Sequence, residues 1–287
     1  MNNILKNLRI KTGLPYFEIP QITKIAWIHH GFLTRLGGVS KAPYESLNLS
    51  ASYGDREENV QKNKQRVAEI FEFDPKRLIL LNQLHQDKIL LIREPLEPVP
   101  FSLEYDAMIT DVPNTYLGVL TADCIPIFMI DRVKKVIAAI HAGRQGTALS
   151  ITSKVLRRMK EEFGCLSKDL IFGMGASIGS CCYEIDEKVF VPEWKPFSTS
   201  KGNGKWMVDL ARINIFQLEK EGIRKEQIFK IDLCTSCHTD LFFSYRKEGQ
   251  TGRQVSTFAT INVAVYNSCI WVKDIGQAQY SIITLFQ

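Results

Sequence analysis

No stretch of this sequence is apolar for long enough to cross a membrane, which takes about 18 residues. The longest apolar stretches, 125–130 and 136–140, have the length of single strands. Residues 1–16 mix Lys and Asn with isolated Leu and Ile, and they lack the unbroken apolar segment of a secretory signal. We therefore expect a cytoplasmic protein without a membrane partner.

The chain also lacks repeats, low-complexity tracts and blocks of like charge. Lys and Arg number 36 against 31 Asp and Glu, a formal net charge of +5, and the densest positive cluster is the short segment 132–135. A nucleic-acid-binding surface needs a basic patch or stripe, so we expect no nucleic-acid partner. The small positive excess favours small anionic ligands instead.

Histidine is scarce, with five residues, and cysteine is present in an odd number, seven. Without an export signal we expect reduced thiols, one of which is recruited for chemistry. The segment 234–238 (CTSCH) fits the pattern of covalent haem attachment, but that attachment needs export, so we expect Cys237 and His238 to be incidental. Cys181 and Cys182 are adjacent and therefore rarely bridge; we expect one to be buried and one exposed.

Two cofactor classes are excluded on similar grounds. The segment 173–179 (GMGASIG) differs from the dinucleotide fingerprint by one residue and precedes no clear helix, which excludes a Rossmann site. A four-copper oxidase needs far more imidazoles than five. A single copper bound by two His, one Cys and a weak Met remains open, with Met108, Met129 and Met174 available.

The length of 287 residues and the apolar share of 45% suffice for a sizeable core. Apolar periodicity predicts helices over 56–73, 145–163 and 209–221. Asp55 and Glu58 have capping-box spacing for the first helix. Gly164 ends the second helix, and Asp209 and Gly222 bound the third.

Strand patterns are more numerous than helix patterns. They cover 77–84, 88–93, 107–110, 116–121, 125–130, 135–141, 170–175, 227–232 and 254–263. The apolar run 136–140 suggests a strand covered on both faces. We read 94–100 as a surface loop and 198–205 as a turn. The pattern predicts one α/β domain over 1–287, with mixed sheets packed and helices on the outside.

Three chemistry-bearing residues are expected at strand ends, where rigid elements aim side chains into a cleft. His85 ends one apolar run, His141 ends another, and Cys124 lies between two apolar strands in 121–126 (TADCIP). Two imidazoles and a thiolate fit a catalytic zinc ion, which keeps three protein ligands and one open position. The alternative is two structural histidines and an inert buried cysteine.

Several segments occur in an order that resembles one known family. They are TRLGGVS (34–40), YESLN (44–48), GD (54–55), QLH (83–85), YDA (105–107), TADC (121–124), HAG (141–143), CYE (182–184), CT (234–235) and FFSYR (242–246). The series resembles YfiH-like proteins, also called multicopper polyphenol oxidase (laccase) domain proteins or peptidoglycan editing factors. It covers about 26–262, and residues 263–287 form an extension of unknown role.

The resemblance implies a single α/β domain and one zinc ion bound by His85, Cys124 and His141. It also implies phosphorolysis of adenosine, inosine or methylthioadenosine, or adenosine deamination, with purine nucleoside and phosphate as partners. A role in editing cell-wall precursors is also attached to the family. Arg144 and Gln145 stand where the family usually has Trp and a basic residue, and Ala176 stands where Pro is usual.

We assign catalytic roles to Cys124, Asp123, His85 and His141, with Asp106 as a further proton carrier or orienting group. We assign substrate binding to Arg35, Arg144 and Arg246, because a guanidinium matches an oxyanion, and also to Asn48. Tyr245 and Phe243 are candidates for stacking on a purine.

Three hypotheses stay open at this point. The first is a zinc enzyme acting on purine nucleosides. The second is an amidase, using Cys124 or zinc, that edits a peptidoglycan precursor. The third is a protein without catalysis, in which zinc stabilises the fold, or a mononuclear copper protein.

Overall fold

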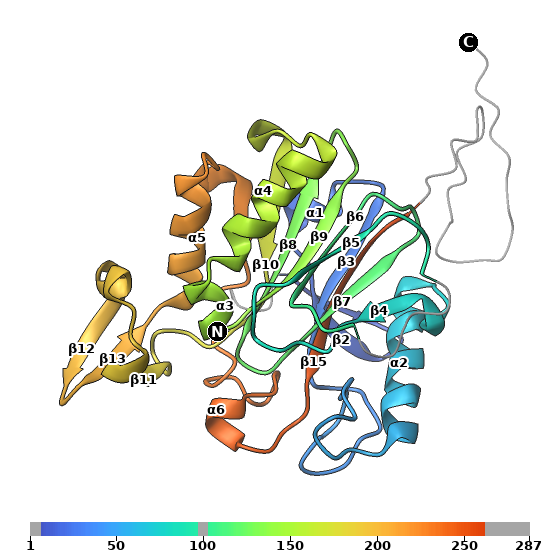
Figure 1. Ribbon diagram of the computed structural model, residues 1–287. Coiled ribbons are helices and arrows are strands. Elements are labelled where there is room, and N and C mark those ends of the chain that lie inside the picture. The colour runs from blue at the N-terminus through green and yellow to red at the C-terminus, as the bar shows by residue number, and fades with distance from the viewer. Residues whose placement is uncertain (1–6, 97–102, 262–287) are drawn as a thin grey trace, which may run out of the picture.

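The computed structural model describes residues 7–96 and 103–261, and these fold into a mixed α/β domain (Figure 1). The first six-stranded sheet has the order β1 (Leu8–Lys11), β2 (Leu14–Phe17), β3 (Ile28–Leu33), β15 (Gln254–Thr260), β7 (Tyr116–Thr121), β4 (Leu78–Leu80). The second has the order β14 (Ile228–Lys230), β10 (Leu170–Met174), β8 (Ile125–Asp131), β9 (Ile137–Ala142), β6 (Ala107–Thr110), β5 (Ile89–Ile92). The predicted fold class is confirmed.

The remaining elements of the described residues are a small third sheet and the helices. The sheet consists of β11 (Glu184–Asp186), β13 (Lys205–Val208) and β12 (Ser198–Gly202). The α-helices are α1 (Pro20–Thr23), α2 (Glu57–Phe71), α3 (Arg144–Ala148), α4 (Ile151–Phe163), α5 (Leu210–Lys220) and α6 (Tyr245–Glu248). The 3₁₀ turns are η1 (Pro75–Arg77), η2 (Ser167–Asp169), η3 (Glu187–Val189), η4 (Pro192–Phe197) and η5 (Lys225–Gln227).

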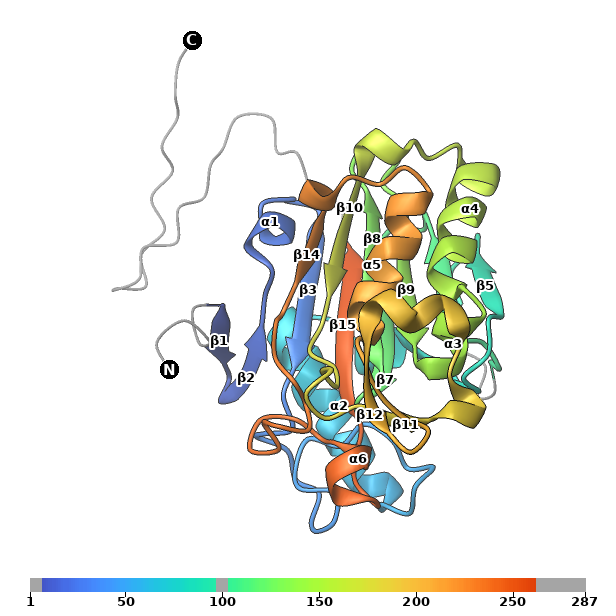
Figure 2. The ribbon, with the colours of Figure 1, turned by 90° about the vertical axis from the view of Figure 1, so that its left-hand side faces the viewer.

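The two large sheets pack face to face, and helices cover their outer faces. In Figure 2, α5 lies in front of β8, β9 and β10, whereas α2 lies behind the first sheet. Phe128 stands between the sheets, with its ring centroid 4.7 Å from that of Phe32 and 4.3 Å from that of Phe258. This aromatic stack joins β3, β8 and β15 and fixes the two sheets against each other.

The central strands are apolar throughout because both of their faces are covered. On β9, Ile137 and Ala139 face the first sheet, while Ala138 and Ile140 face the core beneath α4 and α5. The prediction of a doubly covered strand over 136–140 is thus confirmed. None of the described helices is both long and apolar enough to cross a membrane.

Two of the three predicted helices agree with the structure, and one is divided. The expected helix over 145–163 is two helices, α3 and α4, because Ser150 adopts a left-handed backbone with φ of 57°. The C-terminal Gly164 and the N-cap Asp209, whose carboxylate accepts a hydrogen bond from the Arg212 N–H at 2.9 Å, are confirmed. The expected capping box at Asp55 is wrong, because Arg56 is the N-cap of α2 and no side chain caps it.

The segment 198–205, predicted as a turn, is most of a hairpin. Strands β12 and β13 flank Asn203 and Gly204, which both have positive φ, 51° and 70°. Such a pair fits a tight hairpin turn. The strands β1 to β3 and β11 were not predicted, the strand over 77–84 is limited to β4, and 263–287 lies outside the described residues.

Candidate metal centre

The three predicted ligands meet where the two large sheets are connected. His85 lies in the loop after β4, Cys124 lies between β7 and β8, and His141 lies on β9. The β7–β8 connection crosses from one sheet to the other, so it brings Cys124 to the end of β9. One donor atom from each residue lies within 4.8 Å of the other two. The two imidazole rings are 4.7 Å apart and nearly perpendicular, at 80°.

The buried Asp106 carboxylate holds this cluster together. Its Oδ1 lies 2.8 Å from Nδ1 of His141, which leaves Nε2 available as a metal ligand. The same carboxylate accepts backbone N–H bonds from Leu84, His85 and Gln86 at distances between 2.7 and 3.2 Å. A carboxylate on the outer nitrogen of a histidine is the usual support of a metal-bound imidazole. Asp106 therefore orients His141 and the loop that carries His85.

The charges of the cluster are strongly coupled. Burial of His141 opposes its protonation, but the Cys124 sulfur and the Asp106 carboxylate outweigh burial and raise the pKa of His141 to about 9. Burial likewise opposes ionisation of Cys124, yet His141 and His85 lower its pKa to about 6. Burial raises the pKa of Asp106 less than its hydrogen bonds lower it. The thiol and the imidazole thus each favour the charged form of the other.

Backbone geometry around the cluster is unusual in two respects. His85 and Asp123 have positive φ values of 60° and 90°, a costly conformation for residues other than glycine. Gly143 lies so close that an added Cβ would stand 2.9 Å from the Cys124 sulfur. The segment 141–143 therefore needs glycine at its third position so that the ligands can approach one another.

These residues fit a divalent metal ion. Three donors, two imidazoles and one thiolate, leave a fourth position open, as in catalytic zinc sites. Imidazole and thiolate also bind copper, so the donor set alone does not distinguish zinc from copper.

A cavity of about 1230 Å³ contains the three ligands in its wall. Its lining includes four cationic side chains, Lys64, Arg144, Arg246 and Arg253. Its aromatic lining consists of Tyr53, Tyr183 and Tyr245. The cavity therefore offers positive charge and aromatic surface next to a metal-binding cluster.

Asp123 and Arg246 are two of the predicted site residues, and a hydrogen bond joins them at the cavity wall. The Asp123 carboxylate accepts a hydrogen bond from the Thr235 hydroxyl at 2.6 Å and one from the backbone N–H of Arg246 at 2.7 Å. The Arg246 guanidinium donates to the backbone oxygens of Glu184, at 2.7 Å, and Cys182, at 3.3 Å. Arg144 lines the cavity, and its side chain makes no hydrogen bond or ion pair with other described residues.

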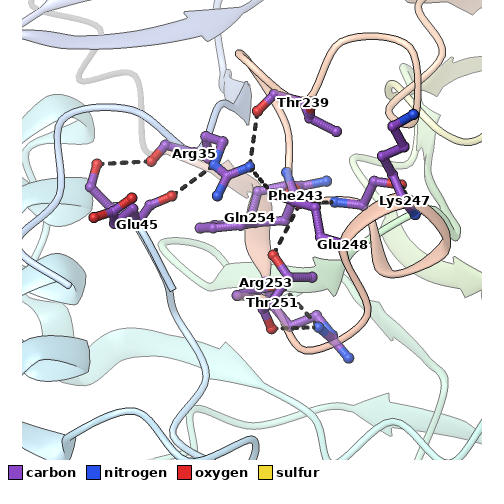
Figure 3. Close-up of polar contacts among 12 residues, drawn as sticks. Arg35, Glu45, Thr239, Phe243, Lys247, Glu248, Thr251, Arg253 and Gln254 are labelled. Carbon is purple, nitrogen blue, oxygen red and sulfur yellow. Dashed lines mark hydrogen bonds and ion pairs between the residues drawn. The ribbon is translucent and has the colours of Figure 1, made fainter. Parts of the chain in front are cut away.

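Arg35 and Asn48 do not line the cavity. Arg35 forms an ion pair with Glu248 at 2.6 Å and donates to the backbone oxygens of Glu45 and Thr239 (Figure 3). Its guanidinium also lies 4.5 Å from the centroid of the buried Phe243 ring.

Asn48 is fully buried and ties together the loops beside the cavity. It donates to the Ser50 oxygen and to the Asp55 carboxylate, both at 2.8 Å, and accepts from the Arg253 N–H at 2.8 Å. Its side chain therefore shapes the cavity wall from behind.

Sequence reasoning missed several residues of the cavity. Tyr183 is part of the quoted motif CYE (182–184) but was given no role, and its pKa is raised to about 12 by burial and by the nearby Cys124 sulfur. Lys64 lies on α2, where burial lowers its pKa. Arg253 packs over the Tyr53 ring at 3.8 Å. The exposed periodicity of α2 could have indicated Lys64 as a surface residue, but no local pattern shows that the first half of α2 lines the cavity.

Gln83 has a clear role that its motif did not disclose. Its side-chain amide donates to the Leu120 oxygen at 2.7 Å and accepts from the Leu120 N–H at 2.8 Å. This pair continues the edge of β7 and holds the loop of His85 against the first sheet.

Comparison with known proteins identifies relatives across most of the described chain. A family profile described as multi-copper polyphenol oxidoreductase laccase matches residues 29–261, which confirms the resemblance expected over about 26–262. Purine nucleoside phosphorylase YlmD of Bacillus subtilis is 30% identical over 240 residues, covering 79% of this chain and 86% of the relative. Purine nucleoside phosphorylase YfiH of Escherichia coli is 32% identical over 232 residues, covering 78% and 90%.

Solved structures agree with this assignment. The crystal structure of the hypothetical protein YfiH from Bacillus licheniformis is 29% identical and has a TM-score of 0.82. The match covers 89% of this chain and 99% of that one.

Proposed function

Since this chain belongs to the multi-copper polyphenol oxidoreductase laccase family, and relatives in it are named purine nucleoside phosphorylase, we propose that it is a zinc-dependent purine nucleoside phosphorylase. The observation that carries the proposal is the convergence of His85, Cys124 and His141 in the wall of a cavity with cationic and aromatic side chains. Adenosine, inosine and methylthioadenosine are the proposed substrates, together with phosphate.

Zinc is favoured over copper by the surroundings of the cluster. A mononuclear copper site of this donor type uses a weak axial methionine. Met108, Met129 and Met174 are all buried in the apolar cores, and none lines the cavity. The open fourth position supports zinc in a catalytic role.

The proposed reaction is a displacement at the anomeric carbon. A phosphate oxygen forms a bond to C1′ of the ribose, the bond from C1′ to the purine nitrogen breaks, and its electron pair leaves with the base, which takes up a proton. A zinc ion held by the three ligands would supply Lewis acidity to this site. Products are the free purine and the pentose 1-phosphate that corresponds to the substrate, which is ribose 1-phosphate from adenosine or inosine and 5-methylthioribose 1-phosphate from methylthioadenosine.

We propose that the cationic side chains of the cavity bind phosphate. Arg144 has no ion-pair partner among the described residues, so its guanidinium is available for a bidentate contact with an oxyanion. Arg253 and Lys64 add positive charge to the same wall. Arg246 is held by two backbone oxygens, and it lies 5.0 Å from the Tyr183 ring centroid, so we propose that it orients Tyr183 and the anion together.

Purine binding falls to Tyr183 and Tyr245, which both line the cavity. Phe243 is buried beneath Arg35, which favours a packing role for that ring. Asp123 accepts two hydrogen bonds within the protein, so we propose that it positions the Cys124 turn and the Arg246 backbone. Arg35 and Asn48 are proposed to act in the same indirect way, through the loops that they join.

The experiment is incubation of zinc-loaded protein with each nucleoside, with and without phosphate. We expect the free base and the corresponding pentose 1-phosphate only when phosphate is present. Arg144→Gln should raise KM for phosphate about tenfold or more, with a smaller effect on KM for the nucleoside. Arg157→Gln is the matched control, because Arg157 pairs with Glu221 on the outer helices.

Two other outcomes would favour a function other than phosphorolysis. Inosine formed from adenosine without phosphate would indicate deamination. Absence of any product at stoichiometric enzyme would sink the proposal and favour a zinc-stabilised protein without catalysis.

One observation favours a second candidate, a cysteine hydrolase of the amidase class. Asp106, His141 and Cys124 stand in the order of an acid–base–nucleophile triad, with the carboxylate 2.8 Å from the imidazole. The same residues would then activate Cys124 for attack on an amide of a cell-wall precursor. Hydrolysis that survives complete zinc removal but is abolished by thiol alkylation would support this function over the first.

A further inference from the structure

Four cysteines outside the candidate metal centre form a second cluster. One sulfur atom from each of Cys181, Cys182, Cys234 and Cys237 lies within 4.8 Å of the other three. Cys237 is 3.4 Å from Cys182 and 3.6 Å from Cys181, measured between sulfurs. The six cysteines within the described residues are all free thiols. Of these four cysteines, only Cys237 was expected to be incidental, and the structure brings it together with the other three.

Parallel pairing of two strands explains why they meet. Strand β10 runs parallel to β14, with Met174 opposite Lys230. The pairing resumes beyond the strands at a bridge between Ser177 and Cys234, so both chains continue side by side in the same direction. The adjacent pair Cys181–Cys182 on one chain therefore arrives at the same place as the Cys-x-x-Cys pair on the other.

The spacing of the sulfurs suits one small tetrahedral ion. A zinc–sulfur bond of about 2.3 Å places the corners of a tetrahedron about 3.8 Å apart. The two measured separations fall slightly below this value, and the cluster as a whole is confined within 4.8 Å. An iron–sulfur cubane requires wider spacing, because each thiolate binds a different iron atom.

The backbone around the cluster has features of a thiolate site. The N–H of Gly179 donates to the Cys234 sulfur at 3.2 Å, which stabilises negative charge on that sulfur. The backbone N–H groups of Cys237 and His238 both donate to the Cys234 oxygen, which forms a tight turn between the two ligands of this segment. The other two described cysteines are not part of this cluster, since Cys124 belongs to the candidate metal centre and Cys165 is buried in the core beneath the outer helices.

We propose that Cys181, Cys182, Cys234 and Cys237 bind one Zn²⁺ as a closed, structural four-thiolate site. Four protein ligands leave no position for a substrate, so the ion acts by joining two segments of chain. Neither the assignment to the family nor the proposed phosphorolysis requires this ion.

The site would stabilise the wall of the candidate metal centre. Thr235, which lies between two of the cysteines, donates to Asp123, the residue before Cys124. The oxygen of Cys182 accepts a hydrogen bond from the Arg246 guanidinium. An ion that fixes the four thiolates would thus fix two groups that hold the neighbouring cavity wall.

The test is zinc content of the full-length protein, measured by elemental analysis after dialysis. We expect two equivalents in the wild type, one in Cys237→Ser, one in Cys124→Ser, and none in the double variant. His238→Ala is the matched control, because it alters the residue after Cys237 without removing a sulfur, and it should keep two equivalents. Wild-type zinc content in Cys237→Ser would overturn the proposal, whatever the Cys124→Ser variant shows.

A second measurement uses the wild-type protein, so it tests the proposal even if the cysteine variants fail to fold. Cobalt added to metal-free wild-type protein should give the strong thiolate-to-metal absorption of a four-sulfur site, in addition to the weaker absorption of a site with one sulfur. Chelation should also expose four further thiols to a thiol reagent. A disulfide found by mass analysis of freshly purified protein, or a cobalt spectrum with a single sulfur ligand, would contradict a metal at these cysteines.

Discussion

His141 carries the strongest electrostatic coupling at the candidate metal centre, because it lies between a thiolate and a buried carboxylate. Both neighbours favour its protonated form, whereas a metal ion needs the neutral imidazole. Asp106 reconciles these demands by accepting a hydrogen bond at Nδ1, which leaves Nε2 for the ion. We therefore expect Asp106, a residue outside the proposed ligand set, to influence metal affinity.

Asp106→Asn tests this role. The amide removes the negative charge, and with Oδ1 kept for His141 its N–H₂ group replaces Oδ2 and faces the backbone N–H donors of Leu84 and Gln86. We expect zinc affinity at the centre to fall by about 10- to 100-fold. The measurement is competition for zinc with a chelator of known affinity.

The matched control is Asp131→Asn, because Asp131 is also buried and also accepts two backbone N–H bonds, from Val133 and Lys134. That variant should lose stability and keep its zinc affinity. Equal zinc affinities in the two variants would show that Asp106 has no special effect on the ion.

His30 provides a pH-dependent stability that is independent of either metal site. Its Nε2 accepts the Ile19 N–H at 2.9 Å, and burial, with a contribution from His29, lowers its pKa from 6.5 to about 3. Between these values the unfolded chain binds a proton that the folded chain does not, so stability falls as pH falls below 6.5. The loss at pH 5 should be about 2 kcal/mol.

His30→Gln checks this expectation, since a glutamine oxygen can accept the same N–H without titrating. Urea unfolding at pH 7 and pH 5 should show a difference in unfolding free energy that is smaller by about 2 kcal/mol in this variant. His238→Gln should keep the wild-type difference, and an unchanged difference in His30→Gln would refute the assignment.

At the scale of elements, the turn from β9 into α3 determines how closely the ligands approach. Gly143→Ala would put a Cβ 2.9 Å from the Cys124 sulfur and 3.2 Å from Cδ2 of His85. Because both neighbours are ligands, we expect the variant to lose the zinc equivalent of this centre, measured by elemental analysis. Gly146→Ala is the control in the same turn, with its nearest neighbours at 3.3 Å and neither of them a ligand. Retained zinc in Gly143→Ala would mean that the ligands need no such proximity.

The sequence predicted those elements whose pattern is local. Strand β9 is covered on both faces, so its continuous apolar run was a sufficient signal. The strand β12 was missed because most of its five residues are exposed and polar, which leaves no alternating pattern. The break at Ser150 was missed because the apolar periodicity continues from α3 into α4, and a single left-handed residue leaves no mark on it.

The residues of the site also fall into two groups, those that a local sequence pattern predicts and those that depend on packing between distant elements. His85, Cys124 and His141 were predictable, because each is a residue with distinctive chemistry next to an apolar strand. Lys64 and Arg253 reach the cavity from α2 and from the segment before β15, so their positions depend on packing between distant elements. The four-cysteine cluster depends on the parallel pairing of β10 with β14, which no pattern within either strand discloses.

At the scale of the whole molecule, the ligands come from both sheets, so the packing between the sheets should control the site. Phe128 is fully buried and stacks on Phe32 and Phe258 of the opposite sheet. Phe128→Ala removes the shared ring and leaves a cavity, so we expect a loss of about 3–5 kcal/mol in unfolding free energy. Val133→Ala is the control, because Val133 is 67% exposed and should change stability by less than about 0.5 kcal/mol.

The same variant tests whether the sheets and the metal centre form one cooperative unit. If they do, Phe128→Ala should lower Tm while zinc release on heating still coincides with loss of the folded signal, since no partly folded state can keep the ligands together. Zinc release followed with a chromogenic chelator, beside circular dichroism on the same sample, makes the comparison. Zinc release well below Tm in the variant, with wild-type release at Tm, would show that the sheets separate at this end before the molecule unfolds.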